Sequence, residues 1–384
     1  MNNTGHFQEY SFSIAKEAVR RGFDTEIWCP RNYSGPKPPF LKPILPALCA
    51  LKRDFFSQLS KNLVMARAFA RLVSSEKFDH DDIIFYPSVF PADLFSLSLA
   101  FTWHRPKARI IGAIRRDLRA LLNYVLSYTN SLIGLPALVF FQLCGLYMNR
   151  ILGIKFASDT EYGTRELGKI GFAGAFTLPI PHLATQNMHG KKREFAICCL
   201  GDARFEKGFD LLPDIIPLVL NQSRHVSFII QSNFQNSPYS AEKVLQSIHA
   251  LDRLEQKFPR RIKLMRGGLG RKDYLSLMSG CSLVLLPYRR RFYGFGGSSG
   301  ILAEAVSCGA WIVVPSGTWM AVQKEKYDKI MEFSDEMPES ISASIYKCTE
   351  LDGKIDCRKV AEQIRNWKRY HSPNILLDIV LKNA

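Results

Sequence analysis

The sequence predicts an α/β fold of two domains facing a cleft, with the first domain lacking its first strand. At 384 residues the chain exceeds one ordinary hydrophobic core and fits two domains. Short apolar runs alternate with amphipathic segments in both halves, as expected for parallel sheets with crossover helices. Residues 181–193 are polar and aperiodic, which indicates a linker between the domains.

The first domain, residues 1–182, begins with an expected helix over residues 7–21 and a strand over 24–29. Because no strand precedes that helix, we expect the first strand of the domain to be missing. The proline-rich residues 31–50 indicate a loop. The other expected elements are helices over 55–73, 91–101, 119–150 and 161–170, and strands over 82–86, 109–114, 153–158 and 175–178.

The second domain, residues 195–356, repeats the alternation. We expect strands over 195–201, 226–231, 261–265, 282–287 and 311–314, and helices over 209–220, 241–257, 271–279 and 299–308. The tail, residues 357–384, is helical with a break at Ser372-Pro373, and we expect it to pack on the first domain.

The chain carries a net charge of +16 spread over both halves, which suits an anionic small substrate or an anionic membrane surface. No stripe of Arg and Lys interleaved with aromatic residues appears, so we do not expect a nucleic-acid partner. The apolar residues 131–148 contain Pro136 and Gln142, which favours a buried or membrane-lying helix over a spanning one.

The cysteine pattern and the polar start favour a cytoplasmic protein, peripheral on the inner face of the membrane if it docks there. The nine cysteines show no disulfide-framework spacing and no CxxC, which indicates a reducing compartment. The adjacent Cys198 and Cys199 lie in an apolar run, where a core role is expected.

Small residues gather where the helix of residues 299–308 is expected to begin: Gly296, Gly297, Ser298, Ser299 and Gly300. Amides in the first turn of a helix lack intrahelical acceptors and attract anions, so this stretch can cradle phosphate. A helix capped by one of the serines after a loop gives the same pattern, and the two interpretations stay open.

Glu304 follows one turn later among apolar neighbours. A carboxylate at this position can accept two hydroxyls of a ribose diol. The alternative is a surface glutamate near a helix amino end.

Arg204 and Lys207 lie in the loop after the expected strand that ends near Gly201. Loops at the carboxyl ends of parallel strands share one edge of a sheet, so this loop and the Ser299 helix start should face the same crevice. Two cations beside a helix amino end would clamp a diphosphate. The alternative is a solvated charged loop.

The segments GDARFEKGFD (from Gly201) and GFGGSSGILAEAVSCGAWIVVP (from Gly294) closely resemble retaining glycosyltransferases of family 4. The resemblance covers most of the chain and is most specific over residues 195–315. It implies the GT-B fold of two Rossmann-like domains. It also implies a metal-independent hexosyltransferase that needs no cofactor besides a nucleotide diphosphate sugar.

The resemblance also implies roles for individual residues. Arg204, Lys207 and Glu304 would act in catalysis, the two cations on the donor diphosphate and Glu304 on the ribose. Gly267, Gly268 and the loop 231–233 would border the base. The acceptor side would contain Gly5, His6, Arg115 and Arg116. The donor site would also include Gly201, Gly208, Tyr288, Gly297, Ser298, Ser299 and Gly300.

Two departures from the family pattern stand out. The first of the family's two glutamates falls at Gly296, which has no side chain. Where the family has a histidine after the fourth strand, this chain offers Arg115 and Arg116, which could meet a phosphate-bearing acceptor or lie on the surface.

The function expected is transfer of a sugar, with retention, to the hydroxyl of a glycan, a lipid-linked acceptor or a polysaccharide intermediate. The alternatives are a same-fold UDP-sugar epimerase and a catalytically impaired nucleotide-sugar-binding protein.

Overall fold

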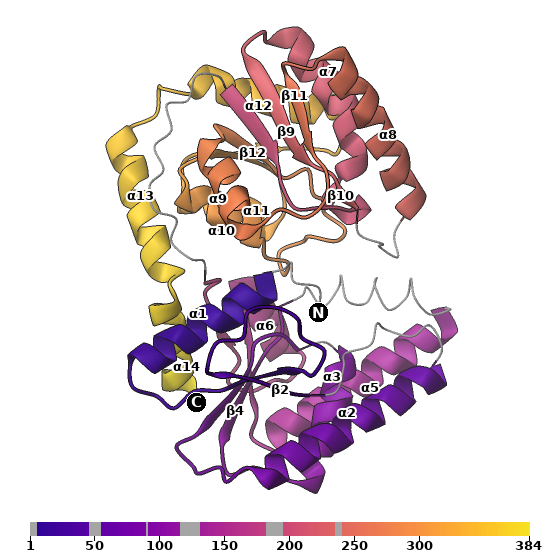
Figure 1. Ribbon diagram of the computed structural model, residues 1–384, viewed down its shortest axis with the longest axis vertical. Coiled ribbons are helices and arrows are strands. Elements are labelled where there is room, and N and C mark those ends of the chain that lie inside the picture. Colours follow the sequence, from indigo (N-terminus) through magenta and orange to yellow (C-terminus); the bar gives the residue numbers. More distant parts are fainter. Residues whose placement is uncertain (1–5, 46–54, 90, 116–130, 182–194, 235–239) are drawn as a thin grey trace. The chain divides into compact units, whose positions relative to one another are not determined.

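A computed structural model describes residues 6–45, 55–89, 91–115, 131–181, 195–234 and 240–384 of the chain (Figure 1). The chain divides into two compact units. The first combines Met1–Pro181 with Pro373–Ala384, and the second is His182–Ser372.

The first unit is built on a parallel sheet of strand order β3-β4-β5-β6, formed by Ile83–Tyr86, Arg109–Ala113, Lys155–Ser158 and Phe176–Thr177. Three long helices pack side by side, with α3 (Pro91–Trp103) between α2 (Phe55–Ser75) and α5 (Ser131–Arg150) (Figure 1). The short helix α6 (Glu161–Lys169) follows β5. Helix α1 (His6–Arg20) contributes Tyr10 and Ile14 to an apolar cluster with Ile111 of β4.

One strand of this unit was not expected. Residues 31–50 were interpreted as a loop, but Leu41–Leu45 forms strand β2, which pairs in parallel with β1 (Ile27–Pro30). Pro43 concealed it, because proline lacks the N–H that a strand interior donates. The two strands form a sheet of their own, and an edge position tolerates the missing donor.

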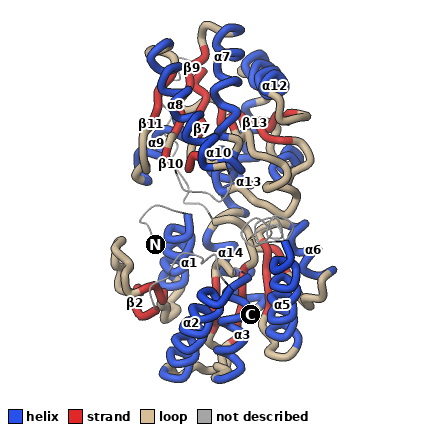
Figure 2. Tube along the Cα trace, turned by 90° about the vertical axis from the view of Figure 1, so that its right-hand side faces the viewer, coloured by secondary structure: helices blue, strands red, loops and turns tan. Residues whose placement is uncertain are grey.

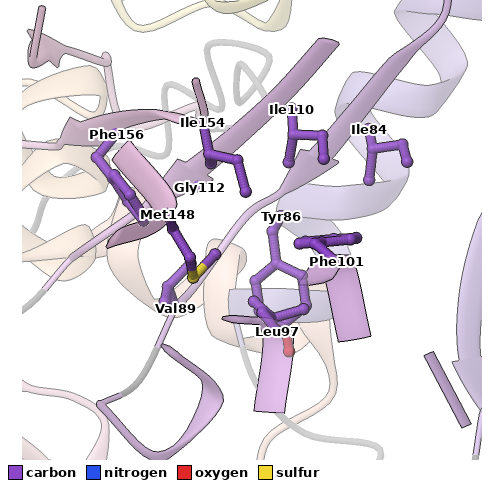
Figure 3. Close-up of a pocket in the computed structure, with 10 residues that line it drawn as sticks. All are labelled: Ile84, Tyr86, Val89, Leu97, Phe101, Ile110, Gly112, Met148, Ile154 and Phe156. Atoms are coloured by element: carbon purple, nitrogen blue, oxygen red, sulfur yellow. The ribbon is translucent and has the colours of Figure 1, made fainter. Parts of the chain in front are cut away.

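Beneath the main sheet of the first unit lies a small apolar cavity (Figure 3). Its walls come from the sheet, including Ile84 and Phe156, and from helices α3 and α5, including Leu97 and Met148. The phenol of Tyr86 also lines it, and burial raises the pKa of that phenol well above its usual range. The lining offers no charged side chain, so the cavity is a gap in the core packing.

The second unit contains a six-stranded parallel sheet of order β11-β9-β7-β12-β13-β14. The strands are Ile262–Met265, Val226–Gln231, Phe195–Cys199, Leu283–Leu285, Trp311–Pro315 and Ile330–Phe333 in that order. Along the chain, β7, β9 and β11 extend the sheet in one direction, and β12, β13 and β14 then extend it in the opposite direction. In such sheets ligands bind at the carboxyl ends where the direction changes, here between β7 and β12.

Helices cover both faces of this sheet (Figure 2). The connections are α7 (Leu212–Gln222), α8 (Ala241–Lys257), α9 (Arg271–Gly280), α10 (Gly300–Ser307), α11 (Trp319–Val322) and α12 (Pro338–Leu351). Two short strands, β8 (Asp202–Ala203) and β10 (Asn233–Phe234), pair beyond the ends of β7 and β9. The described residues of this unit also contain three single 3₁₀ turns: η1 (Phe205–Lys207), η2 (Phe209–Leu211) and η3 (Gln323–Glu325).

The helical tail is shared between the units. It breaks at Ser372-Pro373 as expected, into α13 (Cys357–Tyr370) and α14 (Pro373–Asn383). Only α14 belongs to the first unit, where Arg21 of the chain's start forms an ion pair with Asp378. Helix α13 packs on α10 of the second unit, with the Trp367 indole N–H donating to the Ala303 carbonyl at 3.1 Å. The expectation that the entire tail packs on the first domain is therefore corrected.

No helix in the part of the chain that the structure describes has the length and apolarity to cross a membrane. Helix α5, the candidate from sequence, still presents apolar side chains to solvent. Val139, Phe140 and Leu143 are 50%, 44% and 58% exposed.

The cysteine expectation needs a correction too. Cys198 is fully buried in β7, as predicted, but it forms a disulfide with Cys281, at a Cα–Cα distance of 6.0 Å. Cys281 caps the carboxyl end of α9, which packs on β7, so tertiary packing joins residues 83 apart in sequence. Spacing arguments cannot detect a pair of this kind.

We expect loss of this crosslink to destabilise the second unit. Replacing both cysteines by alanine removes a link across 83 residues, and loop entropy alone predicts a loss of about 4–5 kcal/mol. Chemical unfolding of the wild type, with and without reductant, and of the double variant measures this. Cys357→Ala is the control, since Cys357 is exposed and free. Alkylation of all nine cysteines in the unreduced native-sequence chain would contradict the disulfide.

A second prediction concerns Gly208, between η1 and η2. Its φ is +67°, and a Cβ atom there would collide with the carbonyl oxygen of Pro287, which follows β12. We expect Gly208→Ala to lower the free energy of unfolding by about 2–5 kcal/mol, from backbone strain and overpacking together.

Gly267→Ala is the matched control for Gly208→Ala. Gly267 also has a positive φ of +86°, but nothing lies within 4 Å of an added Cβ. It should cost only about 1 kcal/mol. Equal losses for the two variants in urea unfolding would show that close packing against Pro287 is not the constraint.

Candidate functional site

The candidate site lies at the carboxyl ends of β7 and β12 in the second unit, the switch point of its sheet. Gly201, just after β7, has a φ of +107°. A Cβ atom there would lie 2.8 Å from Ile301 Cδ1 and 3.0 Å from Lys207 Nζ. Gly201 therefore lets the Lys207 ammonium and the first turn of α10 come close together, the convergence that the sequence analysis expected of these two loops.

The amino end of α10 is capped by Ser299. Its Oγ accepts a hydrogen bond from the Leu302 amide at 3.2 Å, and Ser299 itself is extended and buried. Its side chain also hydrogen-bonds that of Tyr288, which is buried behind it and whose phenol has its pKa raised well above the usual range by burial. The hydroxyl of Ser299 thus serves as the helix cap, and an anion at this helix would meet backbone amides.

Arg204 lies in the same loop as Lys207, directly after β8. Its guanidinium contacts Asp202 Oδ2 at 3.0 Å and Glu206 Oε1 at 3.5 Å. The side chains of Arg204 and Asp202 are 31% and 34% exposed, so water screens this ion pair. An incoming anion can therefore compete with it at small cost.

Lys207 is half-buried beside Gly201. Burial, followed by repulsion from Arg204, lowers the pKa of its ammonium group from 10.5 to about 8. This shift is typical of a group that lacks enough negative charge nearby, and a bound anion would reverse it.

Glu304 is not a surface residue, which corrects one of the two interpretations of the sequence. It is 2% exposed, and both carboxylate oxygens accept hydrogen bonds. Arg271 Nη1 donates to Oε1 at 2.5 Å, and the Tyr274 hydroxyl donates to Oε2 at 2.7 Å. Glu304 belongs to the helix whose amino end Ser299 caps.

The sequence analysis missed Arg271 and Tyr274. Both lie on the first turn of α9, three residues apart and therefore on one helix face. That spacing was visible in the sequence, but nothing in it pointed to a glutamate 30 residues further along.

The remaining expected donor-site glycines have different surroundings. The Gly267 carbonyl accepts a hydrogen bond from Gln231 Nε2 at 3.3 Å, and Gln231 Oε1 accepts one from the Gly201 amide at 2.8 Å. Gln231 thus ties the loop after β11 to the loop after β7. Gly268 is exposed, while Gly297 is buried against Tyr293. Ser298 and Gly300 flank Ser299 at the helix start, and Gly208 is accounted for by its packing on Pro287.

The expected acceptor residues belong to the first unit. Gly5 and Arg116 lie outside the described residues, and His6 is the first residue of α1. Arg115 follows β4, where its Nε lies 3.2 Å from Asp159 Oδ2 and its guanidinium lies 4.6 Å from the centre of the Tyr10 ring. The interpretation of Arg115 as a plain surface residue is therefore corrected.

Metal ligands do not gather in the described parts of the chain. No group of three or more His, Cys, Asp or Glu side chains there could hold a metal ion.

Comparisons with known proteins bear on the fold. No protein-family model matches the chain, and no curated protein matches it. Several solved structures, however, match the chain in fold. A glycosyltransferase from Rickettsia africae ESF-5 superposes with a TM-score of 0.65 at 12% identity, over 99% of this chain and 95% of its own.

Two further matches are trehalose-phosphate synthases. The UDP-forming α,α-trehalose-phosphate synthase from Burkholderia xenovorans, in complex with glucose-6-phosphate, gives a TM-score of 0.62 at 13% identity, over 88% of this chain and 78% of its own. A trehalose-6-phosphate synthase studied for glycosyltransfer with retention gives 0.63 at 12% identity, over 86% and 79%. The chain therefore has the GT-B fold of glycosyltransferases, with two Rossmann-like domains.

Proposed function

We propose that this protein is a glycosyltransferase that moves a hexose from a nucleotide diphosphate sugar to an acceptor hydroxyl. The observation that carries the proposal is the meeting of Lys207, Arg204 and the amino end of α10 at the switch point of the second sheet. Similarity in fold to enzymes that handle UDP and sugar phosphates supports it.

The reaction suits the charges at this site. Negative charge develops on the diphosphate as its bond to the sugar breaks. Two fixed cations and the amides at a helix amino end stabilise that charge more in the transition state than in the ground state. In this proposal these groups supply the positive charge for the diphosphate without a metal, and Glu304 receives the ribose hydroxyls.

We further propose retention, by attack of the acceptor hydroxyl on the face that the diphosphate leaves. The retaining synthase of similar fold supports this, as does the resemblance to family 4. A glycan, polysaccharide intermediate or lipid-linked acceptor would suit the first unit. The exposed apolar side chains of α5 and the positive net charge favour peripheral action at an anionic membrane surface.

One observation favours a second candidate, a nucleotide-sugar-binding protein with impaired catalysis. Gly296 lies where family 4 enzymes have their first glutamate, and it is buried, so no side chain of its own can contact the donor sugar. Turnover distinguishes the two functions, since both predict donor binding.

We expect the side chains of Arg204, Lys207 and Glu304 to contribute to donor binding. After a thermal-shift screen of nucleotide sugars identifies the donor, Arg204→Ala and Lys207→Ala should each weaken binding about 10–100-fold, because each removes a charge-assisted hydrogen bond to phosphate. Glu304→Gln should weaken binding less, since it keeps the shape of the side chain.

The matched control for these variants is Arg266→Ala. Arg266 is an exposed cation of the same unit, paired with Asp252 and Glu255 on the surface. Calorimetry gives the affinities, and product analysis with an acceptor pool gives turnover and anomeric configuration. Wild-type affinity and turnover in all three site variants would refute the proposal.

We expect donor affinity to depend on pH through Lys207. Its pKa of about 8 means that the ammonium is charged below pH 8 and loses its proton above it. The donor phosphates stay ionised throughout, so the dissociation constant should be flat below pH 7. It should rise by up to about tenfold per pH unit above 8.

Lys207→Arg provides the control for this titration, because arginine stays protonated over the whole range. Its affinity should lack the rise near pH 8. A wild-type profile that is flat from pH 6 to pH 9.5 would show that Lys207 does not bind the diphosphate as a cation.

A further inference from the structure

The carboxylate of Glu304 is held by two side chains of a neighbouring helix. Arg271 and Tyr274 occupy the first turn of α9, which packs on α10, and Figure 1 shows the two helices next to each other. Arg271 donates to one carboxylate oxygen at 2.5 Å and Tyr274 to the other at 2.7 Å. Two donors on separate oxygens fix both the position and the rotation of the carboxylate plane.

This arrangement also fixes the charge of the acid. The other residues of α10 are apolar or small, so an unpaired carboxylate at position 304 would be costly to bury. The Arg271 guanidinium compensates that charge, and its own side chain remains 24% exposed at the edge of the cluster. Burial, and then the charge of Glu304, raise the pKa of Tyr274 well above 10, so its phenol stays a donor.

The cluster lies beside the proposed diphosphate site. Glu304 lies on the same helix as Ile301, whose Cδ1 would be 2.8 Å from a Cβ atom on Gly201, and that Cβ would also lie 3.0 Å from Lys207 Nζ. Glu304 lies one turn beyond the Ser299 cap. In a nucleoside diphosphate the ribose is bonded directly to the first phosphate, so in the proposed function a fixed carboxylate about one helical turn from the phosphate-binding amides would meet the ribose hydroxyls.

We propose that Arg271 and Tyr274 are positioning residues that orient the Glu304 carboxylate and so make the site select a ribonucleotide over a deoxyribonucleotide donor. The inference rests on the proposed function, in which Glu304 receives the ribose hydroxyls. An ionised carboxylate accepts up to about four hydrogen bonds, so two internal donors are compatible with that role. A polar group aligned for a hydroxyl rejects an analogue that lacks it.

The test measures nucleotide binding by calorimetry. The probes are UDP, GDP, ADP and CDP, and the 2′,3′-dideoxy analogue of whichever binds the wild type best. The wild type should prefer the ribonucleotide strongly. Tyr274→Phe removes a single hydroxyl, and should weaken ribonucleotide binding about tenfold while leaving the dideoxy analogue nearly unchanged. Selectivity for ribose should therefore fall by about the same factor.

Two further variants make the result specific. Arg271→Lys keeps the charge but loses the planar guanidinium, and should reduce selectivity in the same direction with little loss of stability, since Arg271 is partly exposed. Tyr327→Phe is the control, because Tyr327 is a buried tyrosine of the same unit whose hydroxyl donates to the Ala310 carbonyl at 2.9 Å. It should leave selectivity at the wild-type value.

The outcomes separate this inference from the proposed function. If Arg204→Ala weakens binding as predicted while Tyr274→Phe and Arg271→Lys keep wild-type selectivity, the function stands and the positioning role is refuted. Equal weakening of ribonucleotide and dideoxynucleotide also refutes it, because that reports a general structural effect. If none of the four diphosphates binds the wild type, the proposed function itself fails.

Discussion

The close approach of the loop after β7 to the amino end of α10 is the constraint on which the candidate site depends. It requires glycine at position 201, because a side chain there would occupy the space of Ile301 and of the Lys207 ammonium. Gly208 imposes a second limit, since the same loop turns back against the Pro287 carbonyl. These two contacts bring together groups from strands that are adjacent in the sheet but more than 80 residues apart in the chain.

The charged side chains around that contact differ in how deeply they are buried. The acid, Glu304, is enclosed and compensated by Arg271, and both oxygens have donors. The cations, Arg204 and Lys207, are partly exposed, and the lowered pKa of Lys207 reflects burial and the nearby guanidinium. In the proposed function, an anion bound there would relieve the repulsion between Arg204 and Lys207.

Local pattern was enough for most elements of the second unit. Strand β9 and helix α8 have the expected bounds, because each carries a clear period between strong chain breaks. The sequence analysis assigned no elements to residues 316–356, where the structure has β14 and α12. Strand β14 is only four residues long, and α12 is rich in residues of modest helix preference, including three serines and a threonine. Its buried positions Ile341, Ile345 and Cys348 therefore did not stand out.

For the candidate site too, the sequence identified some features and not others. The glycine-rich start of α10, the Arg204–Lys207 loop and Glu304 could be identified from the chain, because residue type and spacing carry their chemistry. A serine cap on α10 was one of two interpretations left open, and the structure assigns it to Ser299. The sequence did not reveal that Arg115 pairs with Asp159 or that Cys198 meets Cys281. Each of these contacts depends on which residues the tertiary structure places next to one another.

By itself, therefore, the sequence determined the α/β class, the two halves and the residues proposed to bind a diphosphate, since these follow from periodicity and local chemistry. Only the tertiary structure decided the environment of each charge. Whether a carboxylate such as Glu304 is solvated or clamped by Arg271 and Tyr274 depends on helix packing across 30 residues of chain, which no local pattern encodes.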